Sequence, residues 1–82
     1  MFQTLGDRVS VLGIFKSGKL KPLRFFWKNK TFPISHITTT YCIKDGEVQK
    51  EVFAVKSFGN IYKLVYIPKD YSWILEEVFL EG

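Results

Sequence analysis

The stretch that decides the fold is residues 16–32, KSGKLKPLRFFWKNKTF. It contains two turn signals, SG and KNK, and the segment between them, 21–27, is rich in aromatic residues. Runs of this kind between such turns are typical of antiparallel hairpins. Because side chains of a strand point alternately to opposite faces, we expect one face to carry Leu23, Phe25 and Trp27, and the other Arg24 and Phe26.

Turn signals recur along the rest of the chain. The motifs DG, GN and PKD separate further runs rich in Val, Ile, Phe, Tyr, Thr and Trp. We therefore predict strands near 8–15, 21–27, 31–43, 47–58, 61–67 and 72–80. The predicted fold class is all-β: a single domain, 1–82, that forms a small SH3-like barrel or a strongly curled antiparallel meander of about six strands.

One predicted strand is apolar on both faces. In 61–67, IYKLVYI, Lys63 is the single charge, and a strand of this kind needs cover on both sides. The sheet is therefore expected to curl into a barrel, to fold into two layers, or to dimerise. The predicted strands 31–43 and 47–58 exceed the usual length of about 5–6 residues, so we expect them to bend at a bulge.

The composition favours a packed domain. Hydrophobic residues make up 46% and aromatic residues 17% of the chain, which argues against disorder. Cys42 is the single cysteine, so no disulfide is expected and a reducing compartment is indicated. The N-terminal stretch does not read as a targeting signal, and no apolar run reaches about 18 residues, so we predict a cytoplasmic protein with no membrane partner.

The residues available for catalysis are few. His36 and Cys42 are the only residues of their kinds, and both fall in the predicted strand 31–43. On such a strand they would share one face, about 20 Å apart at about 3.3 Å per residue. One His and one Cys cannot complete a metal site, and the scattered glycines do not make a phosphate-binding loop. We therefore expect no enzyme, no metal site and no cofactor.

The basic-aromatic block 16–32 is the candidate binding site. Its cations would neutralise phosphates while an exposed aromatic ring stacks on a base, which is how small barrels bind single strands. Two other interpretations stand beside this one: the lysines keep sheet edges from mispairing, or the block binds a protein. The candidate nucleic-acid-binding residues are Lys16, Lys19, Lys21, Arg24, Phe26, Lys28 and Lys30.

A longer pattern runs through the chain. In order, it reads Pro22-x-Arg24-Phe25-x-Trp27-x4-Phe32-x-Ile34, then Phe53-x-Val55, Tyr62-x-Leu64 and Trp73-x-Leu75-x2-Val78. The pattern resembles that of a family of small uncharacterised bacterial all-β domains, written P-x-R-F-x-W-x4-[YF]-x-[VI] … Y-x-L … W-x-L-x2-V. The resemblance covers residues 22–78. It implies an all-β fold and a bacterial origin rather than an activity.

The resemblance also bears on individual residues. It implies that the recurring aromatics Trp27, Phe32, Tyr62 and Trp73 belong to the core of the fold. The chain departs from the family in its first turn, where KNK replaces a glycine and an arginine. It departs again in the third strand, where Thr39 and Tyr41 stand near a position at which the family often has tryptophan.

The charge distribution favours one class of partner. The net charge is +4, but residues 1–30 hold seven cations against one acid, and residues 31–82 hold five against seven acids. A basic segment attracts polyanions. We therefore predict a non-enzymatic binding module with a nucleic acid as its preferred partner. The alternative is a protein-interaction or self-association module, in which the acidic C-terminal strand of one copy could meet the basic hairpin of another.

Overall fold

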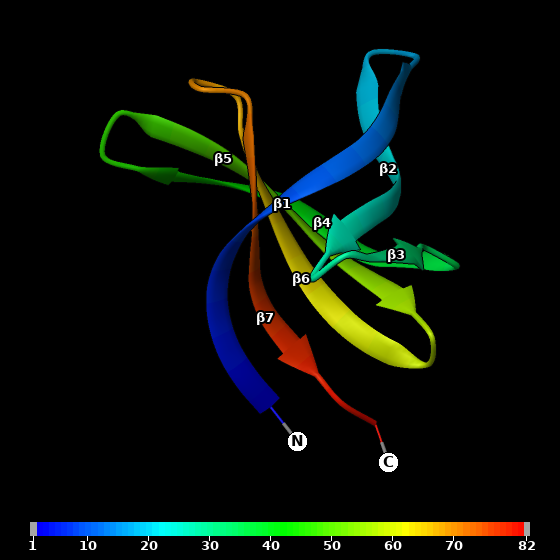
Figure 1. Ribbon diagram of the computed structural model, residues 1–82. Coiled ribbons are helices and arrows are strands. Elements are labelled where there is room, and N and C mark those ends of the chain that lie inside the picture. The colour runs from blue at the N-terminus through cyan, green and yellow to red at the C-terminus, as the bar shows by residue number, and fades with distance from the viewer. Residues whose placement is uncertain (1, 82) are drawn as a thin grey trace.

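The computed structural model describes residues 2–81, and within this range the regular structure consists of seven strands. The sheet is antiparallel throughout, with strand order β3-β2-β1-β7-β6-β5-β4. The strands are β1 (Phe2–Lys16), β2 (Lys19–Trp27), β3 (Lys30–Pro33), β4 (His36–Asp45), β5 (Val48–Ser57), β6 (Asn60–Ile67) and β7 (Ser72–Phe79). The predicted all-β, curled antiparallel meander is confirmed (Figure 1).

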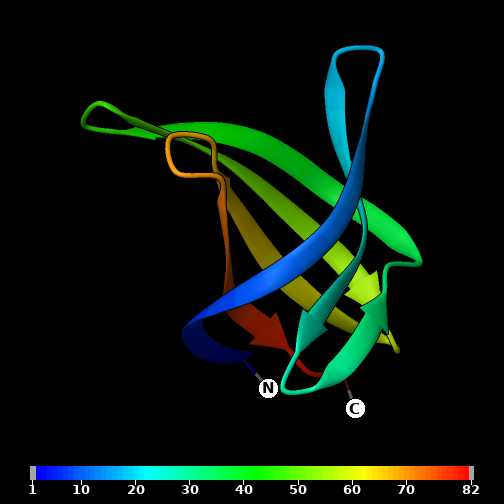
Figure 2. The same ribbon diagram turned by 45° about the horizontal axis from the view of Figure 1, so that its top comes forward.

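The sheet curls so that its two edges approach each other. The edge strands β3 and β4 lie at opposite ends of the strand order, yet they are consecutive in the chain. In the link between them, the backbone N–H of Ile34 donates to the carbonyl of Leu23 on β2 (3.0 Å), and that of Ser35 donates to the carbonyl of Lys56 on β5 (2.9 Å). The link thus bridges the two edges of a curled half-barrel, seen from two directions in Figures 1 and 2.

Two predicted strands differ from the observed ones in extent. The predicted strand 31–43 is divided, because Pro33 has no N–H to donate and the next two N–H groups bind different strands. β3 therefore ends at Pro33, and β4 begins at His36. The predicted strand 8–15 is too short: β1 begins at Phe2 and pairs with β7 on both sides of a register shift between Thr4 and Asp7.

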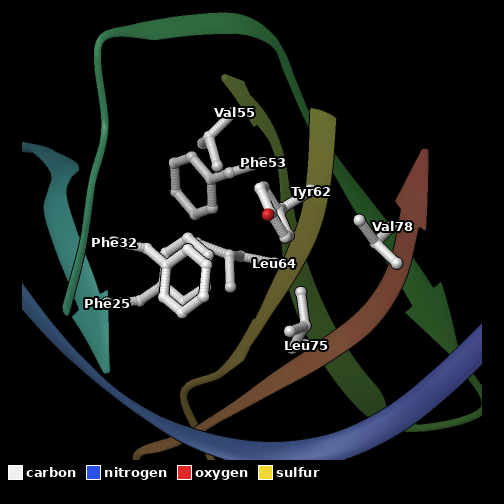
Figure 3. Packing of buried hydrophobic residues seen from close by; sticks show 8 residues of the cluster. All are labelled: Phe25, Phe32, Phe53, Val55, Tyr62, Leu64, Leu75 and Val78. Carbon is white, nitrogen blue, oxygen red and sulfur yellow. The ribbon is translucent and has the colours of Figure 1, made fainter. Parts of the chain in front are cut away.

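The core fills the concave side of the half-barrel (Figure 3). The rings of Phe25 and Phe32 stack with their centroids 4.8 Å apart, and Tyr62 meets the Phe25 ring edge-on at 5.2 Å. Trp27 and Trp73 are half-buried and pack against this cluster. The expectation that Trp27, Phe32, Tyr62 and Trp73 contribute to the core is therefore confirmed. The buried cluster consists of Phe25, Phe32, Phe53, Val55, Tyr62, Leu64, Leu75 and Val78.

A bulge between β1 and β2 removes Leu23 from the core. Leu12 pairs with Arg24 and Gly13 pairs with Pro22, so Leu23 is the extra residue. Leu23 is exposed, and Pro22 is buried in its place. The predicted alternation therefore holds for Phe25 and Trp27 but is wrong for Leu23, because a bulge interrupts the period of two.

Candidate nucleic-acid interface

β1 and β2 extend beyond the half-barrel as a two-stranded arm. Val9 is the last residue of β1 that pairs with β7, and Arg24 is the first residue of β2 that pairs with β3. Between them, residues 10–23 form a hairpin that we call the β1–β2 arm. Figures 1 and 2 both show it projecting away from the rest of the sheet. Ser17 and Gly18 form its tip, both with positive φ, as a tight two-residue hairpin turn requires.

The convex side of the arm gathers most of the predicted cations. Directly opposed residues of an antiparallel pair point to the same face, so the register fixes which side chains lie together. The pairs on the convex side are Ser10–Phe26, Leu12–Arg24, Ile14–Lys21 and Lys16–Lys19. All eight residues are exposed, and we call this surface, which continues onto the bases of both strands, the outer face. Lys16, Lys19, Lys21, Arg24 and Phe26 of the predicted site are therefore brought together.

One cation that the sequence analysis left out continues this row. Arg8 is exposed and lies on β1 two residues before Ser10, so strand alternation puts it on the same side. Its signal was available in the sequence, because Arg8, Ser10, Leu12, Ile14 and Lys16 follow the period of two. Arg8 lies outside the basic block 16–32, so grouping cations by their closeness in sequence leaves it out.

The cations of the arm itself form no ion pair with an acid among the described residues. The ion pairs found among residues 2–81 join Lys50 to Asp45 and Lys63 to Glu76 and Glu77, all outside the arm. Asp7, the single acid of residues 1–30, is half-buried, and its Oδ2 accepts a hydrogen bond from Trp27 Nε1 at 2.9 Å. This bond turns the nearby carboxylate toward the core side. The cations of the arm are therefore left to attract an external anion.

Lys28 and Lys30 lie apart from the arm. They flank Asn29 in the β2–β3 turn, and Lys28 and Asn29 both have positive φ. Lys28 Nζ lies 4.7 Å from the centroid of the Trp27 ring, and Lys30 Nζ lies 4.9 Å from that of Phe58. The turn is at the opposite end of β2 from the arm tip, so the structure divides the predicted set in two. The seven candidates are close in sequence, but Lys28 and Lys30 lie at one end of β2, whereas Lys16, Lys19 and Lys21 lie at its other end.

The concave side of the arm covers an aromatic groove. A cavity of about 160 Å³ is lined by arm residues and by two aromatic rings of the sheet, Tyr66 and Trp73, whose centroids are 4.9 Å apart. Its arm residues are Val11, Gly13, Phe15 and Leu20. A neighbouring hollow reaches Glu51, so this side mixes an acid with its aromatics, and a further hollow brings Asp70 beside Arg8 and Ser10 at the base of the arm. The concave side therefore suits phosphates less well than the outer face.

The shifted pKa values lie away from the arm. The carboxylate of Glu76 accepts a hydrogen bond from Lys63 and raises the pKa of that ammonium group. The Ser72 hydroxyl donates to Asp70 and lowers the pKa of that carboxyl, with a smaller contribution from the charge of Arg8. Both are local ion-pair or hydrogen-bond effects on β6, on β7 and in their connecting turn.

The expected separation of His36 and Cys42 needs one correction. β4 has a register shift between Ile37 and Thr39, so His36 lies opposite Lys56 while Cys42 lies opposite Glu51. These two partners are five positions apart on β5, an odd offset, and His36 and Cys42 therefore face opposite sides of the sheet. Within residues 2–81, no cluster of three or more His, Cys, Asp and Glu side chains is placed to hold a metal ion.

Comparison with known proteins adds no relative. Family models, curated proteins and solved structures were all searched, and none matches this chain. The resemblance to small bacterial domains thus stays a prediction. Among the described residues, no helix is long and apolar enough to cross a membrane.

Proposed function

We propose that this protein is a non-enzymatic binding module that takes a nucleic acid on the outer face of its β1–β2 arm. The observation that carries the proposal is the exposed row of cations along that face. The ion pairs found among the described residues use other side chains, and Asp7 is turned toward Trp27. The row consists of Arg8, Lys16, Lys19, Lys21 and Arg24.

The non-enzymatic part of the proposal draws on the remaining polar residues. His36 and Cys42 face opposite sides of the sheet, so they do not supply a nucleophile and its base. Two acids near the base of the arm serve structural contacts, since Asp7 accepts from Trp27 and Asp70 accepts from a serine hydroxyl. A surface of cations without a reactive group at its centre binds an anion rather than transforming it.

The proposal predicts how steeply the affinity for a nucleic acid should fall as the salt concentration rises. Each phosphate that a protein cation neutralises releases a condensed counterion, with a log–log slope of about −0.9 per contact on duplex DNA. If about four cations of the arm engage, the affinity falls by roughly two orders of magnitude between about 50 and 200 mM salt. A module that bound through apolar contacts alone would show little of this dependence.

Two matched charge variants test the surface. Lys16→Gln combined with Lys19→Gln removes two charges from the arm tip, and Lys28→Gln combined with Lys30→Gln removes the same charge from the β2–β3 turn. Fluorescence anisotropy with labelled DNA and RNA oligonucleotides at low salt measures binding, and circular dichroism checks folding. We expect the arm variant to weaken binding and to reduce the salt slope by about two, while the turn variant keeps both. Equal losses in the two variants, or no binding by the unaltered protein, would contradict the proposal.

The edge strand β4 favours a second candidate function, self-association. Along β4 the side chains are exposed apart from the half-buried Ile37. Natural edge strands of this length usually carry a central lysine, a proline or a bulge that prevents pairing with another chain. In β4 the bulge lies near the start of the strand, and the run Thr39–Ile43 that follows it is uncharged and has no such feature. Light scattering over a concentration series tests this candidate. We expect Tyr41→Lys to abolish any dimer, and a monomer at all concentrations removes the candidate.

The compartment and origin are part of the same proposal. Cys42 is exposed and free, which supports a reducing compartment and hence the cytoplasm. The resemblance to small bacterial domains supports a bacterial origin.

A further inference from the structure

We propose that the nucleic acid is duplex DNA and that the β1–β2 arm lies in its major groove, an inference that rests on the proposed function. The first argument is shape. Two strands about 4.8 Å apart form a ribbon that the major groove, about 12 Å wide, admits, whereas the minor groove of about 6 Å does not. The arm is such a ribbon: its tip projects beyond the half-barrel (Figure 2), and because its concave side covers Tyr66 and Trp73, its outer face is the side open to a groove.

The second argument is the chemistry of the outer face. Its exposed centre is aliphatic: Leu12 and Ile14 are each 42% exposed, with Arg24 and Lys21 directly opposite them. Aliphatic side chains suit the methyl group of thymine, and arginine suits the O6 and N7 acceptors of guanine at the base edges. Proteins that bind single strands rely instead on aromatic rings that stack on unpaired bases. On the outer face the aromatic side chain is Phe26, at the base of the arm, whereas Phe15, 75% exposed beside the tip, belongs to the concave side.

The third argument is the placement of cations along the ribbon. Lys16 and Lys19 oppose each other beside the turn, and the pair Leu12–Arg24 lies four residues further from the tip, about 13 Å along the strand at about 3.3 Å per residue. Cations therefore occur at the tip, in the middle and, with Arg8, beyond the base of the ribbon. This spread lets the arm contact successive phosphates on the walls of a groove while its aliphatic centre meets the floor.

The bulge and the polar tip refine the fit. Gly13 and Pro22 approach so closely that a Cβ on Gly13 would lie 3.0 Å from the carbonyl oxygen of Lys21. Bulges increase the right-handed twist of a ribbon, and a twisted ribbon follows a helical groove better than a flat one. The tip itself, Lys16-Ser17-Gly18-Lys19, is polar, and the exposed apolar side chain beside it, Phe15, faces the concave side rather than the cationic outer face. The arrangement therefore favours a groove over an anionic membrane surface.

The nucleic-acid class is tested with matched probes. Anisotropy at low salt compares a labelled DNA duplex, one of its single strands and the RNA duplex of the same sequence, and a sedimentation assay uses vesicles containing phosphatidylserine. We expect the DNA duplex to bind at least about tenfold more tightly than the single strand, and more tightly than the RNA duplex, whose major groove is too narrow to be read. Methyl green, which occupies the major groove, should displace the protein, and netropsin, which occupies the minor groove, should not.

A matched pair of variants tests the aliphatic contact. Ile14→Thr changes the outer face, and Ile43→Thr makes the same change on β4, where the side chain has a similar exposure, 44% against 42%. Threonine keeps a high strand propensity, so both variants should fold. We expect Ile14→Thr to weaken duplex binding roughly fourfold, which corresponds to about one buried methylene, and Ile43→Thr to leave it unchanged.

The outcomes separate the inference from the proposed function. Equal or tighter binding of the single strand that still depends on Lys16 and Lys19, displacement by netropsin, or equal effects of the two threonine variants would overturn the groove inference and leave the proposed function standing. Binding to vesicles and to no nucleic acid, or no binding at all, would overturn both. Duplex binding that methyl green displaces and Ile14→Thr weakens supports the inference.

Discussion

The hydroxyl group of Ser57 is the basis of a prediction about stability. Ser57 and Ser72 are the two buried polar residues among those described, and Ser57 is 0% exposed. Its Oγ has no hydrogen-bond partner, whereas the Ser72 hydroxyl donates to Asp70. Leaving a buried hydroxyl unsatisfied costs about 1–3 kcal/mol, and removing the hydroxyl removes that cost. We therefore expect Ser57→Ala to stabilise the protein by about 1 kcal/mol, after a small loss of strand propensity.

The same substitution at Ser72 should act in the opposite direction. Ser72→Ala removes a made hydrogen bond, so we expect it to destabilise the protein by about 1 kcal/mol. Urea denaturation gives both free energies, provided that the m-value stays constant. In a domain of this size, 1 kcal/mol corresponds to a shift in Tm of about 4–8 °C. If Ser57→Ala lowers stability, or if both variants shift it in the same direction, the hydroxyl of Ser57 is satisfied in solution and the reasoning fails.

Three further predictions concern other contacts. Gly13→Ala places a methyl group against the backbone of Lys21, so we expect a destabilisation of about 1–3 kcal/mol in urea denaturation. The hydrogen bond with Glu76 raises the pKa of Lys63 in the folded protein, so the stabilisation that this ion pair gives is complete below the ordinary pKa of 10.5. It is lost as the pH rises through the higher pKa of the folded state. We expect the urea midpoint to fall over this alkaline range, and Lys63→Met should remove that fall. Asp7→Ala deletes the acceptor of the indole hydrogen bond, so we expect a loss of about 1 kcal/mol and a changed tryptophan emission, and an unchanged emission would count against that bond in solution.

Local alternation was enough to predict most of the core. Phe25, Trp27 and Phe32 were placed correctly because their environment depends on a period of two within short strands. Leu23 was placed wrongly because the bulge opposite Gly13 depends on how two strands approach each other, and spacing along one strand does not contain that distance. The early start of β1 was missed for a related reason. Gly6 and Asp7 have low strand propensity, and pairing with β7, far along the sequence, overrides it.

Local sequence patterns predicted the part of the candidate site that lies within one hairpin, but not the part beyond the next turn. Lys16, Lys19, Lys21 and Arg24 fall on one face because a single hairpin holds them, which a local pattern can reveal. Lys28 and Lys30 lie four and six residues from Arg24, which is similar to the five residues that separate Arg24 from Lys19. A turn, however, directs them to the rings on the core side. Whether cations converge depends on where each strand ends, and that is set by tertiary pairing.

The strand order has a consequence for how the chain folds. Five of the neighbouring pairs join strands that follow each other in the chain, and β1 with β7 is the exception among the described strands. The units β1–β3 and β4–β7 therefore form from short loops, whereas the β1–β7 pair closes a loop that begins with Phe2 opposite Phe79. Loop closure over most of the chain costs conformational entropy that short hairpins avoid. The rate of folding should accordingly be limited by the meeting of two preformed meanders, with β1–β7 pairing as the late step.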